Sequence, residues 1–146
     1  MSLPPIGDLL PHGPEMTLLD EAVSIAEGHF IAAVTISPDR PLAVAGQGMP
    51  AHVGIEYMAQ ACGAYVGALA YGEGLPVQIG YLLGTRNFHA TRPWFAFGTR
   101  LLIHVIEILR EDGMGVFDCK ITDGDEIIAT AQLNVHQPKD IRVEEK

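Results

Sequence analysis

The sequence predicts an α+β domain in which a curled antiparallel sheet wraps around one long central helix. The chain has 146 residues, which fits a single domain with a hydrophobic core of its own. Its pattern of apolar and turn residues predicts two strands, then one helix, then a run of further strands. A lone helix that follows a hairpin can be buried only by a sheet that curls around it.

The first two strands are predicted to form a hairpin. Residues 1–16 are rich in Pro and Gly and predict a loop that leads into it. Leu18–Ile25 and His29–Ile36 are strand-like runs, and the short connection Ala26–Gly28 favours a tight turn between them. Ser37–Gly48 contains several Pro and Gly residues, so we expect a loop there.

A long helix is predicted from Pro50 to Gly72. Proline suits the first turn because its missing N–H would have no helical partner there, and Gly72 and Gly74 are typical of a helix end. The span is about 22 residues, or ~33 Å at 1.5 Å per residue. Its interior contains the glycines Gly54, Gly63 and Gly67. Each costs ~1 kcal/mol relative to Ala, so we expect close approach of the sheet or a partner helix to offset that cost.

Further strands are predicted after the helix, each ended by turn residues. Breaks fall at Pro93 with Gly98, at 111–113 and at 123–125. The strands cover residues 77–90, 99–109, 115–122 and 126–136. From Pro138 the chain is charged, and we expect a frayed tail over 138–146. No repeat or linker divides residues 1–146, and the order of elements is that of a hot-dog fold.

Composition excludes several classes of protein. Apolar residues make up 48% of the chain and the formal charge is −9, so disorder is excluded and the basic footprint of a nucleic-acid-binding protein is missing. Cys62 and Cys119 form no CxxC motif, which argues against a disulfide scaffold or a zinc site and suits the cytoplasm. The N-terminus lacks the pattern of a signal peptide. We expect no metal and no cofactor.

Polar residues at helical spacing mark the predicted helix. His52, Glu56 and Gln60 are four residues apart and therefore share one face. They argue for a buried core helix rather than a membrane span. Glu56 is the only charged side chain of this helix, and a carboxyl group buried in such surroundings suits a general acid. The alternative is that the stripe faces solvent or forms a dimer contact.

The start of the helix is a candidate substrate-binding site. Free N–H groups and the positive end of the helix dipole favour a developing oxyanion. Gly46, Gly48 and Pro50 would let a substrate carbonyl approach the backbone. The predicted substrate-binding residues are Gly48, Met49, Pro50 and Gln60.

The run from Met49 to Gln60 resembles the central-helix motif of β-hydroxyacyl-ACP dehydratases, in which the acid position matches Glu56. Leu10–Asp20 resembles the Pro-His-x-x-Pro segment of the same family. The chain is most similar to the hot-dog dehydratase group of aryl polyene pathways. The matching stretches lie between Pro11 and Pro138 and comprise residues 54–60, 82–86, 115–117 and 133–138.

The resemblance implies a hot-dog homodimer with active sites at the subunit interface. It also implies dehydration of a 3-hydroxyacyl thioester on acyl carrier protein to a trans-2-enoyl thioester. In the family, a histidine removes the C2 proton and the helix acid helps water leave from C3. The acid would be Glu56.

The histidine is where the sequence departs from the family. Fatty-acid dehydratases place their base in a loop 14 residues before the helix acid, where this chain has Leu42. His29 lies in a similar Gly-His-Phe motif but at the start of a predicted strand, so we do not expect it to be the base. His12, in the Pro-His motif, and His52, one turn from Glu56, are both candidates.

Two other functions fit the same pattern. A hot-dog thioesterase would use Glu56 to direct water at the thioester carbonyl. A chain without the loop histidine could instead be a non-catalytic partner that completes a heterodimer, or an acyl-binding module. Arg86, Arg92 and Arg100 are a candidate docking patch for an acidic carrier protein, although scattered solvated arginines would look the same.

Overall fold

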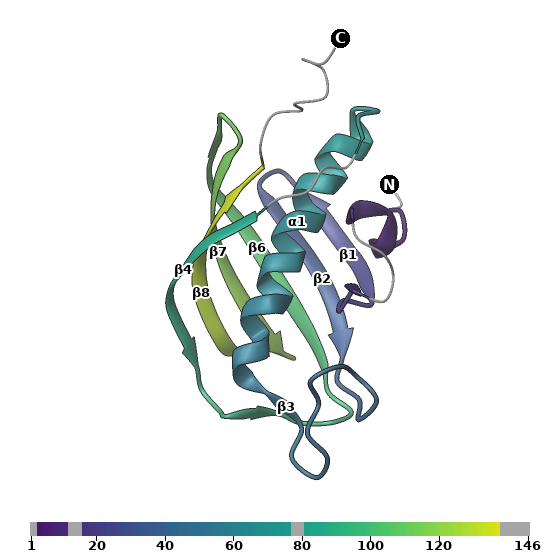
Figure 1. The fold of residues 1–146 in the computed structure, drawn as a ribbon, viewed down its shortest axis with the longest axis vertical. Helices are drawn as coiled ribbons and strands as arrows, with labels where there is room; N and C mark the ends of the chain where they lie inside the picture. The colour runs from purple at the N-terminus through teal and green to yellow at the C-terminus, as the bar shows by residue number, and fades with distance from the viewer. Residues whose placement is uncertain (1–2, 12–15, 77–80, 138–146) are drawn as a thin grey trace.

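A computed structural model describes residues 3–11, 16–76 and 81–137. Its main elements are an α-helix, α1 (Gly54–Gly72), and one antiparallel sheet that curves around it (Figure 1). The strands of this sheet are β1 (Glu21–Ala26), β2 (His29–Thr35), β4 (Tyr81–Ala90), β6 (Arg100–Glu111), β7 (Met114–Asp123) and β8 (Glu126–His136). Their order across the sheet is β1-β2-β6-β7-β8-β4. No helix in the described ranges is long and apolar enough to cross a membrane.

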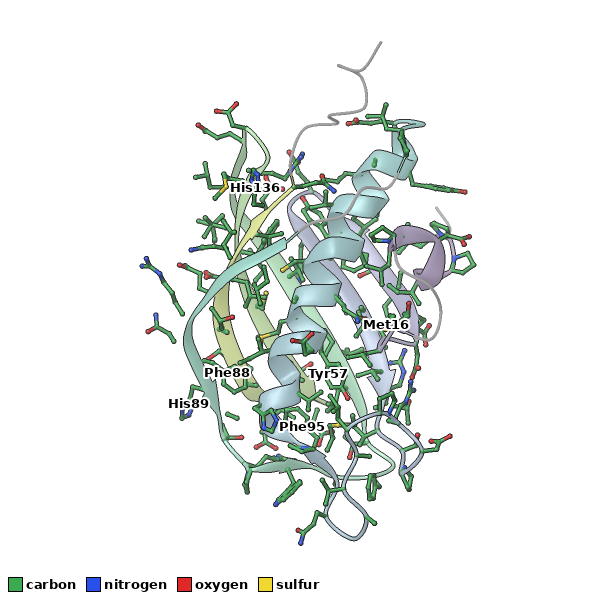
Figure 2. All side chains as sticks on the ribbon, viewed as in Figure 1. Met16, Tyr57, Phe88, His89, Phe95 and His136 are labelled. Atoms are coloured by element: carbon green, nitrogen blue, oxygen red, sulfur yellow. The ribbon has the colours of Figure 1, made fainter. Side chains whose placement is uncertain are left out.

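The sheet buries its concave face against α1. Along β6, Leu101, Ile103 and Val105 are fully buried, while the residues between them are half-buried. Alternate residues of a strand point to opposite faces, so these three side chains line the helix side of the sheet. Tyr57 and Phe95 point into the same core (Figure 2). The predicted helix wrapped by a curled antiparallel sheet is therefore confirmed.

The start of the helix differs from its prediction. Pro50 does not lie in the first helical turn but in a short strand, β3 (Met49–Pro50), which pairs with β5 (Trp94–Phe95). The Ala51 N–H donates to the Pro93 carbonyl at 2.9 Å, which keeps the backbone extended through Pro50. A 3-10 turn, η3 (Ala51–Val53), then leads into α1. The predicted end at Gly72 is confirmed.

The N-terminal segment also differs from its prediction. Residues 1–16 were expected to be a loop, but Ile6–Leu9 form a 3-10 helix, η1, packed beside α1 (Figure 1). The first strand begins at Glu21 rather than Leu18, because the Leu18 N–H bonds to a side chain of α1 instead of a neighbouring strand. The predicted strand residues 77–80 and the predicted tail 138–146 lie outside the described residues.

The interior glycines of α1 allow close approach, as the sequence predicts. A Cβ atom on Gly54 would lie 3.0 Å from Ile121 Cδ1 of the sheet. A Cβ on Gly67 would overlap the carbonyl oxygen of Leu9, so the partner at this point is η1 rather than the sheet or another helix. Gly63 is less crowded, because its Cβ would meet only Leu10 Cδ2, at 3.4 Å.

Gly67→Ala and Gly63→Ala should therefore have opposite effects. The new methyl group at Gly67 meets rigid backbone, and overpacking of this kind costs about 1–3 kcal/mol of unfolding free energy. At Gly63 the methyl group meets a flexible side chain, so the better helix propensity of Ala leaves the protein unchanged or up to ~1 kcal/mol more stable. Urea denaturation of both variants measures the difference, and equal stabilities would contradict the assigned η1 contact.

Candidate functional site

Glu56 lies on the face of α1 that the sheet does not cover. The helix residues buried against the rest of the chain are Gly54, Tyr57, Met58, Ala61, Cys62, Ala64, Tyr65 and Gly67. His52 and Glu56 point away from this stripe, and both are exposed. The expectation that the chain itself buries Glu56 is therefore wrong, because one sheet covers only one side of a helix. The predicted clustering of His52, Glu56 and Gln60 on one face holds.

The surroundings of Glu56 on the open face are apolar. Ile55, Ala59, Gly63 and Val66 are all half-buried in the single chain. Glu56 is the only carboxylate in α1. The exposed acid thus stands at the N-terminal end of a stripe of small and aliphatic residues that the described part of the chain covers only in part.

The predicted substrate-binding residues before the helix pack against their own chain. Gly48 has φ +124°, and a Cβ there would lie 2.5 Å from the Phe95 carbonyl oxygen. Met49 is 1% exposed, and its side chain belongs to the core. Pro50 is half-buried. The absence of a Cβ at Gly48 therefore serves the approach of β3 to β5.

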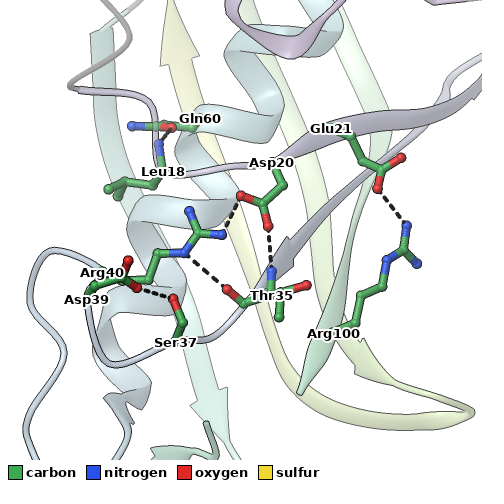
Figure 3. A network of polar contacts seen from close by, with 9 residues as sticks. All are labelled: Leu18, Asp20, Glu21, Thr35, Ser37, Asp39, Arg40, Gln60 and Arg100. Atoms are coloured by element: carbon green, nitrogen blue, oxygen red, sulfur yellow. Dashed lines mark hydrogen bonds and ion pairs between the residues drawn. The ribbon is translucent and has the colours of Figure 1, made fainter. Parts of the chain in front are cut away.

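Gln60 is held by two backbone groups of the N-terminal segment. Its Oε1 accepts a hydrogen bond from the Leu18 N–H at 2.8 Å, as Figure 3 shows, and its Nε2 donates to the Met16 carbonyl at 2.8 Å. Met16 lies beside α1 on the side of β1 (Figure 2). The amide thus joins residues of the same chain, a role that its place on the Glu56 face did not predict.

A polar network continues from this point. Asp20 accepts the Thr35 N–H at 2.7 Å and forms an ion pair with Arg40, whose Nε donates to the Thr35 carbonyl at 3.1 Å (Figure 3). Burial is the main cause that raises the pKa of Tyr57 to about 12. The nearby charge of Arg40 lowers this pKa and that of Asp20 raises it. Sequence reasoning missed this network, because no motif links Asp20 to an arginine in a distant loop.

The histidines do not assemble around Glu56 in the described part of the chain. His12 lies outside the described residues, and His52 is one turn before Glu56. His29 begins β2, as predicted, and points away from α1, because its neighbour Phe30 packs on the helix residue Tyr65. His29 Nε2 lies 3.4 Å from His104 Nδ1.

The described ranges contain no cluster of side chains suited to binding a metal ion. No group of three or more His, Cys, Asp and Glu side chains there could hold a metal ion. Cys62 and Cys119 are free thiols with sulfur atoms 3.6 Å apart between α1 and β7. Burial is the main cause that raises the pKa of the Cys62 thiol well above its usual value.

The arginines of the proposed docking patch differ in their partners. Arg92 pairs with Asp123 and Glu126, and Arg100 pairs with Glu21. Arg86 is exposed on the edge strand β4. Nearby carboxylates therefore offset most of the positive charge that the sequence places between positions 86 and 100.

Three surface hollows occur among the described residues, and the first of them reaches Val66 of the apolar stripe. One is at the β6–β7 turn beside Arg110, one is on the β7–β8 surface beside Lys120, and one is between the β1–β2 turn and Tyr65. Neither His52 nor Glu56 lines any of these three.

Comparisons with known proteins agree with this architecture. The family model for ApeP-like proteins, described as ApeP dehydratase, matches residues 4–145. The dehydratase heterocomplex ApeI:P from Xenorhabdus doucetiae contains a chain 28% identical to this one, with 99% of this chain and 97% of that chain covered and a TM-score of 0.91. No curated protein matches the chain.

More distant structures share the fold alone. The PaaI protein from the phenylacetic acid degradation operon of E. coli is 19% identical, over 79% of this chain and 80% of that one, with a TM-score of 0.59. A hypothetical thioesterase with coenzyme A from Streptococcus pneumoniae is 14% identical, over 80% and 84%, with a TM-score of 0.63. The predicted hot-dog fold is confirmed.

His104 should make the stability of the protein depend on pH. Burial first, and then the charges of Lys120 and His29, lower the pKa of His104 below its usual 6.5. The unfolded chain therefore binds more protons than the folded one just below pH 6.5, so stability is lost as the pH falls through that value. His104→Gln should flatten this loss between about pH 7 and 5, as measured by urea denaturation at each pH. The exposed His89→Gln is the matched control, and equal slopes in wild type and His104→Gln would contradict the prediction.

Proposed function

The chain belongs to the ApeP-like dehydratase family, and from this premise we propose that it removes water from a 3-hydroxyacyl thioester on an acyl carrier protein. The product would be the trans-2-enoyl thioester. Membership of a dehydratase family, with the structural match to the ApeI:P dehydratase, supports dehydration in aryl polyene biosynthesis. The single observation that carries the assignment of the site is the one carboxylate of α1, Glu56, on the helix face that the sheet leaves open.

The reaction needs one base and one acid. A base takes the proton from C2, which the neighbouring thioester carbonyl makes acidic, and the C2 electrons form the new double bond to C3. The C3–O bond breaks, and the leaving hydroxyl takes a proton from the acid and departs as water. We assign the acid to Glu56, in its protonated form.

The base is His12 or His52. His52 precedes Glu56 by one turn, and both side chains are exposed on the same side of the helix. His12 has the support of the resemblance, and it belongs to the segment whose continuation, Met16 and Leu18, bonds to Gln60 one turn beyond Glu56. These two observations leave both histidines as candidates.

We propose that a second hot-dog subunit completes the site. Proton transfer by a carboxylic acid benefits from exclusion of water, and a single chain leaves Glu56 exposed beside the half-buried Ile55, Ala59, Gly63 and Val66. A partner that covered this stripe would bury apolar area and close a slot over the acid in the same step. The partner is a second copy or, as in the heterocomplex of the matched structure, a different chain.

The other parts of the proposal follow from this arrangement. The backbone around Gly48, Met49 and Pro50 borders the start of the helix, where an oxyanion would be stabilised. Exposed Arg86 is the strongest remaining contact for an acidic carrier protein, because Arg92 and Arg100 are paired with carboxylates. Free, buried thiols at Cys62 and Cys119 suit the cytoplasm.

Glu56→Gln should remove the dehydratase activity. The amide cannot supply the proton, and loss of a positioned acid costs about 10²–10⁴-fold in rate. The protein, purified together with any hot-dog subunit that accompanies it, is incubated with a 3-hydroxyacyl carrier protein, and loss of one water from the intact thioester is followed by mass spectrometry. Glu73→Gln, at the exposed residue that directly follows α1, is the control. Full activity of Glu56→Gln would overturn the assigned role.

His12→Gln and His52→Gln separately identify the base. The variant that removes it should lose as much activity as Glu56→Gln, while the other keeps most of its rate, because only one group takes the C2 proton. The same mass assay measures both, and circular dichroism checks that each variant is folded. If both variants keep the wild-type rate, neither of these histidines is the base.

A further inference from the structure

We propose that Gln60 is a positioning residue that holds the N-terminal segment Met16–Asp20 beside Glu56. Its position on the Glu56 face predicted contact with substrate, but its amide bonds to the protein itself. The inference rests on the proposed role of Glu56, since it concerns what fixes the protein around that acid.

The two hydrogen bonds of the Gln60 amide use both of its ends. Oε1 accepts the Leu18 N–H and Nε2 donates to the Met16 carbonyl, each at 2.8 Å. A carboxamide presents a donor and an acceptor on the same carbon, so one side chain can satisfy an N–H and a C=O of the same segment. Neither a carboxylate nor an aliphatic side chain can make both bonds.

The same segment is fixed at its other end. The Asp20 N–H donates to the Ala33 carbonyl at 2.8 Å, and the Asp20 carboxylate accepts the Thr35 N–H and pairs with Arg40. Arg40 belongs to the loop that leads towards Gly48 and the start of the helix. A brace formed by Gln60, Asp20 and Arg40 therefore ties α1, the N-terminal segment and this loop together (Figure 3).

The brace lies close enough to Glu56 in the helix to influence the position of the reacting groups. Gln60 lies one helical turn after Glu56 on the same face, so the points at which it holds the segment, Met16 and Leu18, are about one turn of the helix from the acid. Leu18 is partly buried against the core, whereas the Met16 side chain is 60% exposed. Displacement of reacting groups by about 1 Å can cost ~10²-fold in rate, so loss of the brace should slow the chemical step more than it weakens substrate binding.

Gln60→Leu and Gln60→Glu test the proposal, with Gln132→Leu as a matched control on the outer face of the sheet, where the Gln132 amide bonds to Asp118. Hydrogen exchange is measured at two amides of the same segment. In Gln60→Leu the Leu18 amide should exchange at least ~10-fold faster because its acceptor is gone, while the Asp20 amide stays protected. Gln60→Glu retains the acceptor for Leu18 but loses the donor to Met16, so it should keep most of the protection at Leu18.

The kinetic constants provide the second measurement. With the intact complex and a 3-hydroxyacyl carrier protein, we expect kcat of Gln60→Leu to fall at least ~10-fold while KM changes by less than about threefold. Gln60→Glu should lose kcat as well, because its carboxylate faces the Met16 carbonyl without a hydrogen to share. Gln132→Leu should match the wild type in exchange and in both constants.

Three results would overturn the inference. The first is unchanged exchange at Leu18 in Gln60→Leu. The second is faster exchange there with wild-type kcat. The third is a raised KM with unchanged kcat, which would assign Gln60 to substrate binding. The exchange measurement does not depend on activity, so failure of the Glu56 proposal, seen as full activity of Glu56→Gln, is distinguishable from failure of this one.

Discussion

The rest of the structure depends on which face of α1 is turned toward the sheet. One curved sheet can cover only one side of a helix, and the side it covers is set by the large buried residues Tyr57, Met58 and Tyr65. Packing of these side chains against the sheet is worth ~1.5–3 kcal/mol for each large group, which far exceeds the benefit of hiding one carboxylate. Glu56, two residues from Met58, is therefore turned outward.

Because Glu56 points outward, its face of α1 meets the N-terminal segment, at Gln60, rather than the core of the sheet. Side-chain hydrogen bonds hold the described part of the N-terminal segment beside α1, in addition to the backbone bond from Asp20 to β2. Gln60 satisfies Met16 and Leu18, and Asp20 satisfies Thr35. Gly67 supports the same arrangement, because the absence of a Cβ lets η1 lie directly on the helix. The Gln60 amide and the absence of a Cβ at Gly67 thus hold the described parts of the N-terminal segment against α1, and Asp20 joins that segment to β2.

Sequence reasoning succeeded where the signal is periodic or local. Alternating apolar residues and turn residues located the strands of the main sheet, and spacing by four placed His52, Glu56 and Gln60 on one face. It failed where the outcome depends on contacts distant in the sequence. An apolar helix composition does not say which face the chain covers, so the exposure of Glu56 was missed. The pairing of Met49 with Phe95 involves two-residue strands too short for a pattern, and the Gln60 bonds span 42 and 44 residues.

The exposed acid and the apolar stripe beside it link assembly to chemistry in the proposed mechanism. A carboxylic acid transfers its proton best where water is excluded, and the single chain leaves Glu56 exposed. A subunit placed over Ile55, Ala59 and Val66 would remove water from the acid and bury the stripe together, so the site would exist only in the complex. The formal charge of −9 opposes association with an acidic partner over long distances. The stability of such a complex must then come from apolar burial on this face, which is the same area that shelters the acid.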